Sequence, residues 1–383
     1  MRRAVIWAAY FVVAMTAAHA EVPAFSLGGC TGEKGAPWKQ QIEICSALIQ
    51  SGGGSDVERA LAFKNRGNAY VQIDDGDKAL ADYTEAVRLD PKSAAAYVSR
   101  GDVYIDREDP DRAIADYTSA IQIDPKNVAA YGARTLAYSQ KGDFDHAIAD
   151  ASEAVRLDPK SAAAFLSRAD AYRFKGDFDR AIADYDEALS LDPTHKLHDI
   201  LNNRALAYAS KGDREHALAD YSEAIRLNPT DPDPPFNRGR LYIYSDAIPM
   251  AVADFTKATE LEPRYAYAAL WLDIADARAK APSVLSKGAE KLDMTRWPAP
   301  IVRLFHGQTT SAEVLAAAAD PNAAIQIGQV CETNFYSGEW ALRQGNKDAA
   351  APLFENAARD CPKTFIERGA SIAELKALGA AVP

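Results

Sequence analysis

Few side chains in this sequence have the type and spacing that metal binding requires. His195 and His198 lie three apart in a predicted loop, where surface polar residues are a better interpretation than metal ligands. Asp74, Asp75 and Asp77 resemble part of a calcium loop, but they lack the glutamate that would complete it. We interpret both groups as surface polar residues, and we expect no metal and no cofactor.

The sequence also lacks the motifs of common catalytic nucleophiles. No serine lies in a nucleophile elbow, and no histidine pair has the spacing of a zinc-peptidase helix. Turns such as Gly142-Asp143 lack the Gly-Lys-Ser/Thr ending of a phosphate-binding loop. We therefore expect no catalytic residue, and binding is the better interpretation. An enzyme subunit with a catalytic pair hidden in the C-terminal third stays open as an alternative.

The four cysteines are predicted to form two disulfides. The chain is expected to be exported to an oxidising compartment, and neither a Cys-x-x-Cys motif nor a neighbouring histidine indicates a metal site. Cys30 and Cys45 would tie a predicted helix over residues 42–49 to the segment before it. Cys331 and Cys361 are expected at the start of one helix and the end of the next, which an antiparallel hairpin brings together.

The predicted helices, which would position any binding residue, recur along the chain with a period of 34 residues. In one unit the repeated slots hold aromatic, small and proline residues, namely Tyr97, Gly101, Tyr104, Ala113, Tyr117, Ala120 and Pro125. Within each half of a unit the apolar residues fall three or four apart, which is one face of an α-helix. A turn such as Gly176-Asp177 separates the halves, and the closing proline ends the second helix. Each unit is therefore a predicted helix hairpin.

This spacing is similar to the tetratricopeptide signature. The resemblance implies an all-α fold, an α-α superhelix in which hairpins stack because one hairpin cannot bury both of its apolar stripes alone. It also implies a concave inner groove. Six repeats are expected within residues 56–263, at 60–91, 94–125, 128–159, 162–193, 196–229 and 232–263.

Two charged slots recur on the predicted hairpins. An arginine recurs on the first helix of each unit and an aspartate on the second. We predict an ion pair inside each repeat that staples its two helices together, whereas arginines that faced the groove would be candidates for ligand binding. The predicted pairs are Arg66–Asp82, Arg100–Asp116, Arg134–Asp150, Arg168–Asp184, Arg204–Asp220 and Arg238–Asp254.

First-helix residues that face away from the packed stripe are expected to line the groove. The candidate peptide-binding residues at these slots are Lys64, Asn68, Gln72, Asp102, Asp170, Arg173, Asn202, Phe236 and Arg240. The remaining slots of the predicted lining hold Val98, Asp106 and Leu166. A solvated face without a fixed ligand is the alternative for each of them.

One established way of binding peptides in the resembled family is a clamp for a C-terminal carboxylate. Lys64 and Asn68 match two positions of that clamp. Ser99 and Ala133 stand where the clamp needs an asparagine and a basic residue, so the match is incomplete. A protein or peptide partner is expected nevertheless.

The N-terminus has the features of a secretory signal peptide over residues 1–20. Arg2-Arg3 precede the apolar run 4–15, which is too short to span a bilayer, and a small-x-small site predicts cleavage before Glu21. The mature protein is therefore expected to be periplasmic or secreted, without an integral membrane segment.

Residues 21–55 are expected to form a disulfide-tied cap and a Gly/Ser linker. Lipid attachment at Cys30 is the less favoured alternative, because Glu21 and Pro23 separate that cysteine from the apolar run. The net charge of the chain is −11. This charge makes nucleic acid a poor partner, because phosphate backbones need clustered Lys and Arg.

Residues 264–383 depart from the repeat and end in a predicted hairpin over 331–362. Over residues 264–378 the chain resembles the tail of NlpI-type tetratricopeptide lipoproteins, on Trp297, Ile301-Val302, Gly307 and the run 332–338. That resemblance implies an adaptor for cell-envelope enzymes. We expect an exported scaffold that binds a protein or peptide in its groove, and a self-associating structural solenoid is the alternative.

Overall fold

The computed structural model describes residues 28–31, 37–192, 197–245, 247–283, 285, 289–362 and 365–383. Within these ranges the regular secondary structure is helical throughout, which confirms the all-α prediction. The chain divides into two compact units, residues 1–130 (unit 1) and residues 131–383 (unit 2). The predicted signal peptide over residues 1–20 lies outside the described residues.

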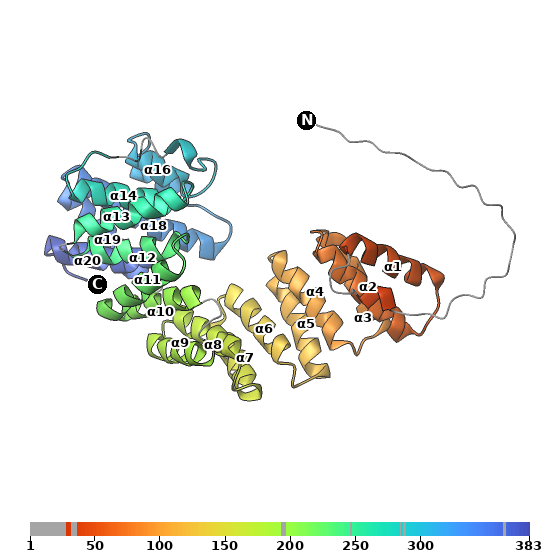
Figure 1. Cartoon of the computed structure of the whole chain (residues 1–383). Helices are drawn as coiled ribbons and strands as arrows, with labels where there is room; N and C mark the ends of the chain where they lie inside the picture. The colour runs from red at the N-terminus through yellow and green to blue at the C-terminus, as the bar shows by residue number, and fades with distance from the viewer. Residues whose placement is uncertain are drawn as a thin grey trace. The chain divides into compact units, whose positions relative to one another are not determined.

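Unit 1 consists of a helical cap followed by two helix hairpins. Its elements in chain order are η1 (Gly28–Thr31), α1 (Trp38–Ser51), α2 (Asp56–Val71), α3 (Gly76–Leu89), α4 (Ala94–Asp106) and α5 (Pro110–Ile123) (Figure 1). Helices α2 and α3 pack together, as do α4 and α5, while α1 covers α2 and α3 contacts α4. The cap therefore shields the apolar face that the first repeat would otherwise expose.

Unit 2 begins within α6 and continues the hairpins. Its repeat helices are α6 (Val128–Gln140), α7 (Phe144–Leu157), α8 (Ala162–Lys175), α9 (Phe178–Leu191), α10 (Leu197–Lys211), α11 (Arg214–Leu227), α12 (Asp233–Ile243) and α13 (Ile248–Leu261). The C-terminal elements are α14 (Ala266–Arg278), η2 (Ala289–Lys291), α16 (Ala299–Phe305), α17 (Ser311–Ala317), α18 (Ala323–Arg343), α19 (Lys347–Asp360) and α20 (Ile366–Leu378). Each odd-numbered helix from α7 to α13 contacts the even-numbered helix that follows it, so neighbouring hairpins stack.

Side-chain caps fix where the second helices of the hairpins begin. An aspartate before the helix accepts a hydrogen bond from the backbone N–H three residues later, which satisfies a donor that the helix itself leaves free. Gly142 and Gly176 precede two of these caps with φ of +73° and +85°, a region that favours glycine. The capping aspartates are Asp75, Asp109, Asp143, Asp177 and Asp213.

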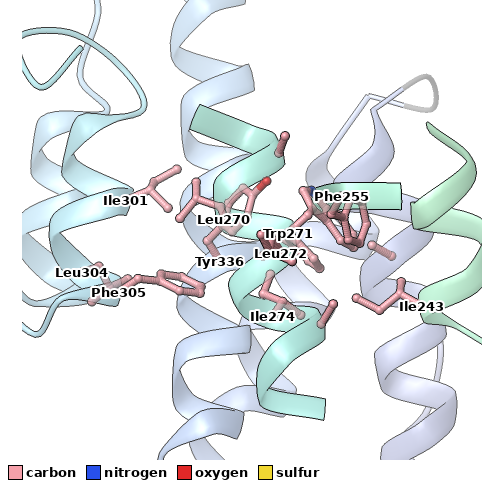
Figure 2. Packing of buried hydrophobic residues seen from close by; sticks show 14 of the residues in the cluster. Ile243, Phe255, Leu270, Trp271, Leu272, Ile274, Ile301, Leu304, Phe305 and Tyr336 are labelled. Carbon is pink, nitrogen blue, oxygen red and sulfur yellow. The ribbon is translucent and has the colours of Figure 1, made fainter. Parts of the chain in front are cut away.

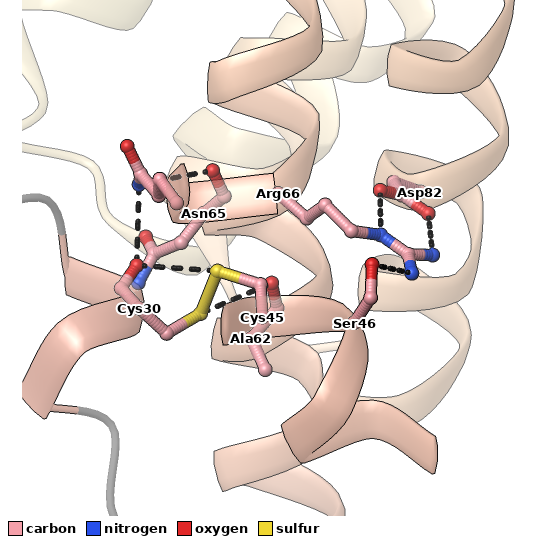
Figure 3. Close-up of a disulfide and its surroundings, with 8 residues drawn as sticks. Cys30, Cys45, Ser46, Ala62, Asn65, Arg66 and Asp82 are labelled. Carbon is pink, nitrogen blue, oxygen red and sulfur yellow. Dashed lines mark hydrogen bonds and ion pairs between the residues drawn. A yellow bond between two sulfur atoms is a disulfide. The ribbon is translucent and has the colours of Figure 1, made fainter. Parts of the chain in front are cut away.

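The Arg–Asp staples are present in all six predicted repeats. In each of them the guanidinium donates two hydrogen bonds of 2.7 or 2.8 Å to the carboxylate of its partner. Figure 3 shows the first pair, in which Arg66 spans to Asp82 and also donates to Ser46 of the cap. The aspartates are buried, so these arginines hold the hairpins together rather than face a ligand.

The disulfide between Cys30 and Cys45 ties η1 to α1, with the two Cα atoms 4.9 Å apart. Both cysteines are fully buried against Ala62 of α2 (Figure 3). The amide of Gln41 donates to the backbone carbonyls of Cys30 and Asn65 at 3.2 and 3.3 Å. The bridge therefore ties the cap together, while burial against Ala62 and the bond from Gln41 to Asn65 hold the cap on the first repeat.

The largest core of the protein lies in the C-terminal part of unit 2. Trp271 of α14 is 1% exposed and stacks on Phe335, with 5.4 Å between the ring centroids. Figure 2 shows Phe255 of α13 beside Trp271, with Phe305 of α16 approaching the same core. Residues 264–330, which depart from the repeat period, supply part of this core through α14, α16 and α17.

The last hairpin is longer than its sequence suggested. The hairpin was predicted to begin at residue 331, but its first helix, α18, already begins at Ala323 and runs to Arg343 without an interrupting proline. Cys331 therefore lies inside α18 rather than at its start. It still reaches Cys361 at the end of α19, with the Cα atoms 5.1 Å apart, which confirms the second disulfide.

The two helices of a hairpin approach closely, so replacing glycine with alanine should lower stability at one position and raise it at another. A Cβ atom at Gly338 would lie 2.6 Å from Cε1 of Phe354, whose ring is fully buried. Gly338→Ala should therefore lower the free energy of unfolding of this hairpin by about 1–3 kcal/mol. Hydrogen exchange of α18 and α19 would measure the loss.

Gly369 is the matched control, because a Cβ there meets nothing within 4 Å and the residue lies within α20. Gly369→Ala should stabilise the same region by about 0.5–1 kcal/mol through its higher helix propensity. Equal effects at the two glycines would show that the packing of Gly338 on Phe354 is not tight.

Candidate functional site

A pocket of about 410 Å³ lies in unit 1. Three of the predicted groove residues, Asn68, Gln72 and Asp102, line it together. The remaining lining residues come mainly from α1, α2 and α4 and are Thr31, Trp38, Gln41, Asn65, Val71, Tyr83, Ser99, Val103 and Asp106. Because α2 and α4 are the first helices of successive repeats, their equivalent faces converge on one hollow. Lys64 is half-buried on α2 and is not among the lining residues.

Tyrosines of the second helices fix two of these groove residues. The hydroxyl of Tyr83 donates to Asn68 Oδ1, and the hydroxyl of Tyr117 donates to Asp102 Oδ1, both at 2.8 Å. The tyrosine lies 15 residues after its acceptor in each case. The packed aromatic of each hairpin therefore orients one polar side chain at the pocket, a positioning contact that the repeat slots alone did not reveal.

A second pocket, of about 290 Å³, lies in unit 2 and contains the predicted residues Arg173 and Arg240. Arg173 is on α8 and Arg240 is on α12, so the two side chains come from the fourth and sixth repeats. The other lining residues are Phe178, Leu206, Ala209, Ser210, Leu241, Tyr244, Trp271, Phe365, Ile366, Gly369 and Ala370. The contribution of residues 365–370 was missed, because helix periodicity does not show where a closing helix packs.

The other predicted groove residues of unit 2 are occupied within the fold. Asp170 accepts hydrogen bonds from the Tyr185 hydroxyl at 2.5 Å and the Asn203 amide at 3.4 Å. Asn202 accepts one at 3.1 Å from the amide of Asn237. The contacts with Asn203 and Asn237 connect the first helices of neighbouring repeats. Neither Asp170 nor Asn202 is among the residues that line the two pockets.

Phe236 differs from the prediction. It is 4% exposed and packs in the core against Tyr265 and Phe255, with ring centroids 4.9 and 5.9 Å away. Residues 231–235 contain three prolines around the start of α12, which begins at Asp233. The repeat slot therefore assigned Phe236 to a groove, whereas its ring helps to fill the C-terminal core.

The described histidine and aspartate residues that were considered for metal binding are not among the residues that line the two pockets. His195 is outside the described residues, and His198 lies with Asp199 and Asp231, with possible ligand atoms within 4.8 Å of one another. Asp75 caps α3, and Asp77 binds Arg107 at 2.5 Å. These contacts give Asp75 and Asp77 structural roles.

Several carboxyl groups are buried in the C-terminal core. Glu339 and Glu374 both bind Arg278, at 2.9 and 2.5 Å, and burial raises the pKa of Glu339. Glu332 accepts hydrogen bonds from the Tyr267 hydroxyl at 2.8 Å and the Trp297 indole at 2.6 Å. These contacts satisfy the buried groups and join α14 to α18 and α20.

Glu367 gives a pH-dependent prediction for this region. Burial, together with repulsion from Glu332, raises the pKa of Glu367 to about 7, although Arg240 acts in the opposite direction. Because the folded state holds this proton more tightly than the unfolded state does, protonation of Glu367 favours folding. This contribution is complete below pH 4.5, the pKa of the unfolded carboxyl, and it is lost as the pH rises through about 7. The C-terminal helices should therefore be about 2.5 kcal/mol less stable at pH 8 than at pH 5 from this group.

Hydrogen exchange of α20 at the two pH values would measure this change after correction for the intrinsic exchange rate. Glu367→Gln should flatten the pH dependence, because the amide stays neutral. Glu355→Gln, at an exposed position on α19, is the control and should leave the dependence unaltered. A Glu367→Gln protein with the full pH dependence would contradict the assignment to Glu367.

No helix within the described ranges is both long and apolar enough to cross a membrane. Residues 64–128 and 133–196 match one family model of the tetratricopeptide repeat, and residues 198–231 match another. These matches confirm that the chain contains tetratricopeptide repeats within residues 64–231, and the sixth predicted repeat, 232–263, lies beyond them.

The chain is also similar to solved structures. A tetratricopeptide repeat protein from Parabacteroides merdae ATCC 43184 is 20% identical, with a TM-score of 0.51, 62% of this chain covered and 92% of that one. A chain of the APC/C hetero-tetramer Cut9-Hcn1 is 15% identical, with a TM-score of 0.51, 62% of this chain covered and 48% of that one. YrrB, described as a TPR protein with an unusual peptide-binding site, is 24% identical, with a TM-score of 0.41, 49% of this chain covered and 94% of that one. At these identities the likeness concerns the fold alone.

Proposed function

Because residues 64–128, 133–196 and 198–231 are tetratricopeptide repeats, we propose that this protein is a scaffold that binds a segment of another protein or peptide. The observation that carries the proposal is the origin of the pocket linings. In each unit, side chains from the first helices of different repeats converge on one hollow. The second helices add only Tyr83 and Phe178 to the two linings, and they supply the aspartates of the staples that hold the hairpins together.

The pocket of unit 1 has the chemistry for an extended peptide. Gln72 offers amide donors and an acceptor, which match the N–H and C=O groups of a peptide backbone. Trp38 is 44% exposed at the same pocket and offers an apolar surface to a side chain of the ligand. Asp102 and Asp106 add negative charge, so a peptide with a basic residue should be favoured there.

The test is binding of the intact chain to an array of short peptides, followed by variants. Gln72→Ala with Asp106→Ala removes two exposed pocket side chains, and it should weaken the selected peptides about tenfold or more. Gln122→Ala with Glu85→Ala changes the same kinds of side chain on the second helices α5 and α3, and it should have no effect. Equal effects of the two double variants would overturn the assignment to this pocket.

Export is a separate part of the proposal, supported by the signal-like pattern of residues 1–20. An adaptor role for cell-envelope enzymes is supported by the resemblance of residues 264–378 to NlpI-type lipoproteins. The N-terminal sequence of the protein made in its native host should begin at Glu21. A mature protein that retains Met1 would contradict export, and the envelope role would fail with it.

A further inference from the structure

The two arginines in the pocket of unit 2 differ from the stapling arginines of the same fold. Each staple binds its aspartate through two hydrogen bonds of 2.7 or 2.8 Å. Arg240 instead donates to the neutral amide of Asn237 at 2.9 Å, and its Nε is buried without a hydrogen-bond partner. A guanidinium held in this way lacks the carboxylate that would offset its burial.

Arg173 is also incompletely neutralised. Its Nε donates to the Tyr185 hydroxyl at 3.2 Å, and its closest carboxylate contact is with Asp170, at 3.7 Å. Asp170 already accepts hydrogen bonds from Tyr185 and Asn203. One shared carboxylate at this distance leaves donors of Arg173 available to a ligand.

The repeat pattern shows why Arg240 is available. Its slot on the first helix is occupied by Asn68, Asp102 and Asp170 in other repeats, where a tyrosine 15 residues later donates to it. The residue 15 positions after Arg240 is Phe255, which has no hydroxyl group. The sixth repeat thus replaces an internally bonded acceptor with a cation that the hairpin does not bind.

The guanidinium groups of Arg173 and Arg240 both influence one buried group, the hydroxyl of Tyr221. Arg173 and Arg240 both interact electrostatically with the buried hydroxyl of Tyr221 on α11, opposing the rise in its pKa that burial causes. Glu367 also interacts with Arg240, but with a pKa of about 7 its carboxyl is partly protonated at neutral pH. The positive charge at this pocket is therefore only partly offset, in a chain whose net charge is −11.

Apolar side chains make up most of the remaining wall. Phe178, Leu206 and Leu241 come from the repeats, and Phe365 with Ile366 comes from the segment at the start of α20. Such walls lower the local dielectric constant, which strengthens a charge-assisted hydrogen bond between a guanidinium and an anion. They would also accept an apolar side chain next to that anion.

We propose that Arg173 and Arg240 form a binding site for the carboxylate of a peptide whose neighbouring side chain is apolar. This inference rests on the proposed peptide-binding function and names the ligand chemistry of one of its pockets. A C-terminal carboxylate and an aspartate side chain share that chemistry. The two sources are separated by the peptides used in the test.

The test uses the intact chain and three fluorescent probes read by anisotropy. The first is a short neutral peptide ending in phenylalanine with a free C-terminus, the second is the same peptide amidated, and the third is amidated with an aspartate before the phenylalanine. A C-terminal site binds the first probe about tenfold or more tighter than the second, and a side-chain site binds the third in the same way. Affinity for the preferred probe should fall with added salt.

Arg240→Gln and Arg173→Gln should each abolish this preference, and Arg240→Lys should restore it in part because the charge remains without the fork of donors. Arg226→Gln is the matched control, an exposed arginine on α11 that should not alter it. Equal binding of all three probes, insensitive to these variants, would overturn the carboxylate inference and leave the scaffold function standing. Absence of peptide binding by both pockets, here and in the array, would defeat the scaffold function itself.

Discussion

Replacing both Cys331 and Cys361 with alanine is expected to lower the stability of the α18–α19 hairpin by about 3–4 kcal/mol. The bridge closes a segment with a sequence separation of 30 and joins the interior of α18 to the end of α19. Both cysteines are 3% exposed, so the variant also loses buried sulfur contacts. The measurement is hydrogen exchange of α18 and α19, which reports local opening without assuming that the whole chain unfolds at once.

A reducing agent added to the unaltered protein should reproduce the loss, and it should have no further effect on α18 and α19 in the double variant. The Cys30–Cys45 bridge serves as an internal comparison, because its reduction should loosen α1 and leave the last hairpin unchanged. Identical protection of α18 in the oxidised and reduced protein would contradict a stabilising role for the second bridge.

Asp184→Ala should destabilise the fourth repeat by about 3–5 kcal/mol, because it leaves the guanidinium of Arg168 partly buried without its partner. Arg168 donates to Asp184 at 2.7 and 2.8 Å, and the two side chains are 20% and 10% exposed. Hydrogen exchange of α8 and α9 would show the loss.

Glu187→Ala is the control on the same helix, because Glu187 is exposed and should change stability by less than about 0.5 kcal/mol. Adding Arg168→Met to Asp184→Ala should recover part of the loss, since the unpaired charge is then removed. A double variant as unstable as the sum of the two single variants would show that the pair does not act as a unit.

Much of the fold could be predicted from local sequence patterns. The arginine and aspartate of each staple recur at a fixed separation, and an antiparallel hairpin brings such slots together in every repeat. The cysteine pairs were predictable for the same reason, since they lie at positions that one hairpin or one cap juxtaposes. Contacts within a hairpin depend on short separations, which the repeat period fixes.

The binding pockets were only partly predictable, because they depend on contacts between repeats and with the closing helix. Asn68, Gln72 and Asp102 line one pocket, but Phe236 fills the core instead of a groove. Arg173 and Arg240 meet residues 365–370, which lie far from both in sequence. No period in the sequence predicts where such a C-terminal helix docks.

The central claim is that the partner binds at the two pockets, which are lined mainly by first helices, and not at the exposed faces of the second helices. The most direct measurement places a photo-activated cross-linking residue at Gln72 or Ser210, which line the two pockets, and at Gln122 or Glu187 on second helices. In cells that make the intact chain, we predict covalent adducts with the same partner proteins from one or both pocket positions, and none from the second-helix positions. Adducts of equal yield from all four positions, or from the second helices alone, would contradict the account.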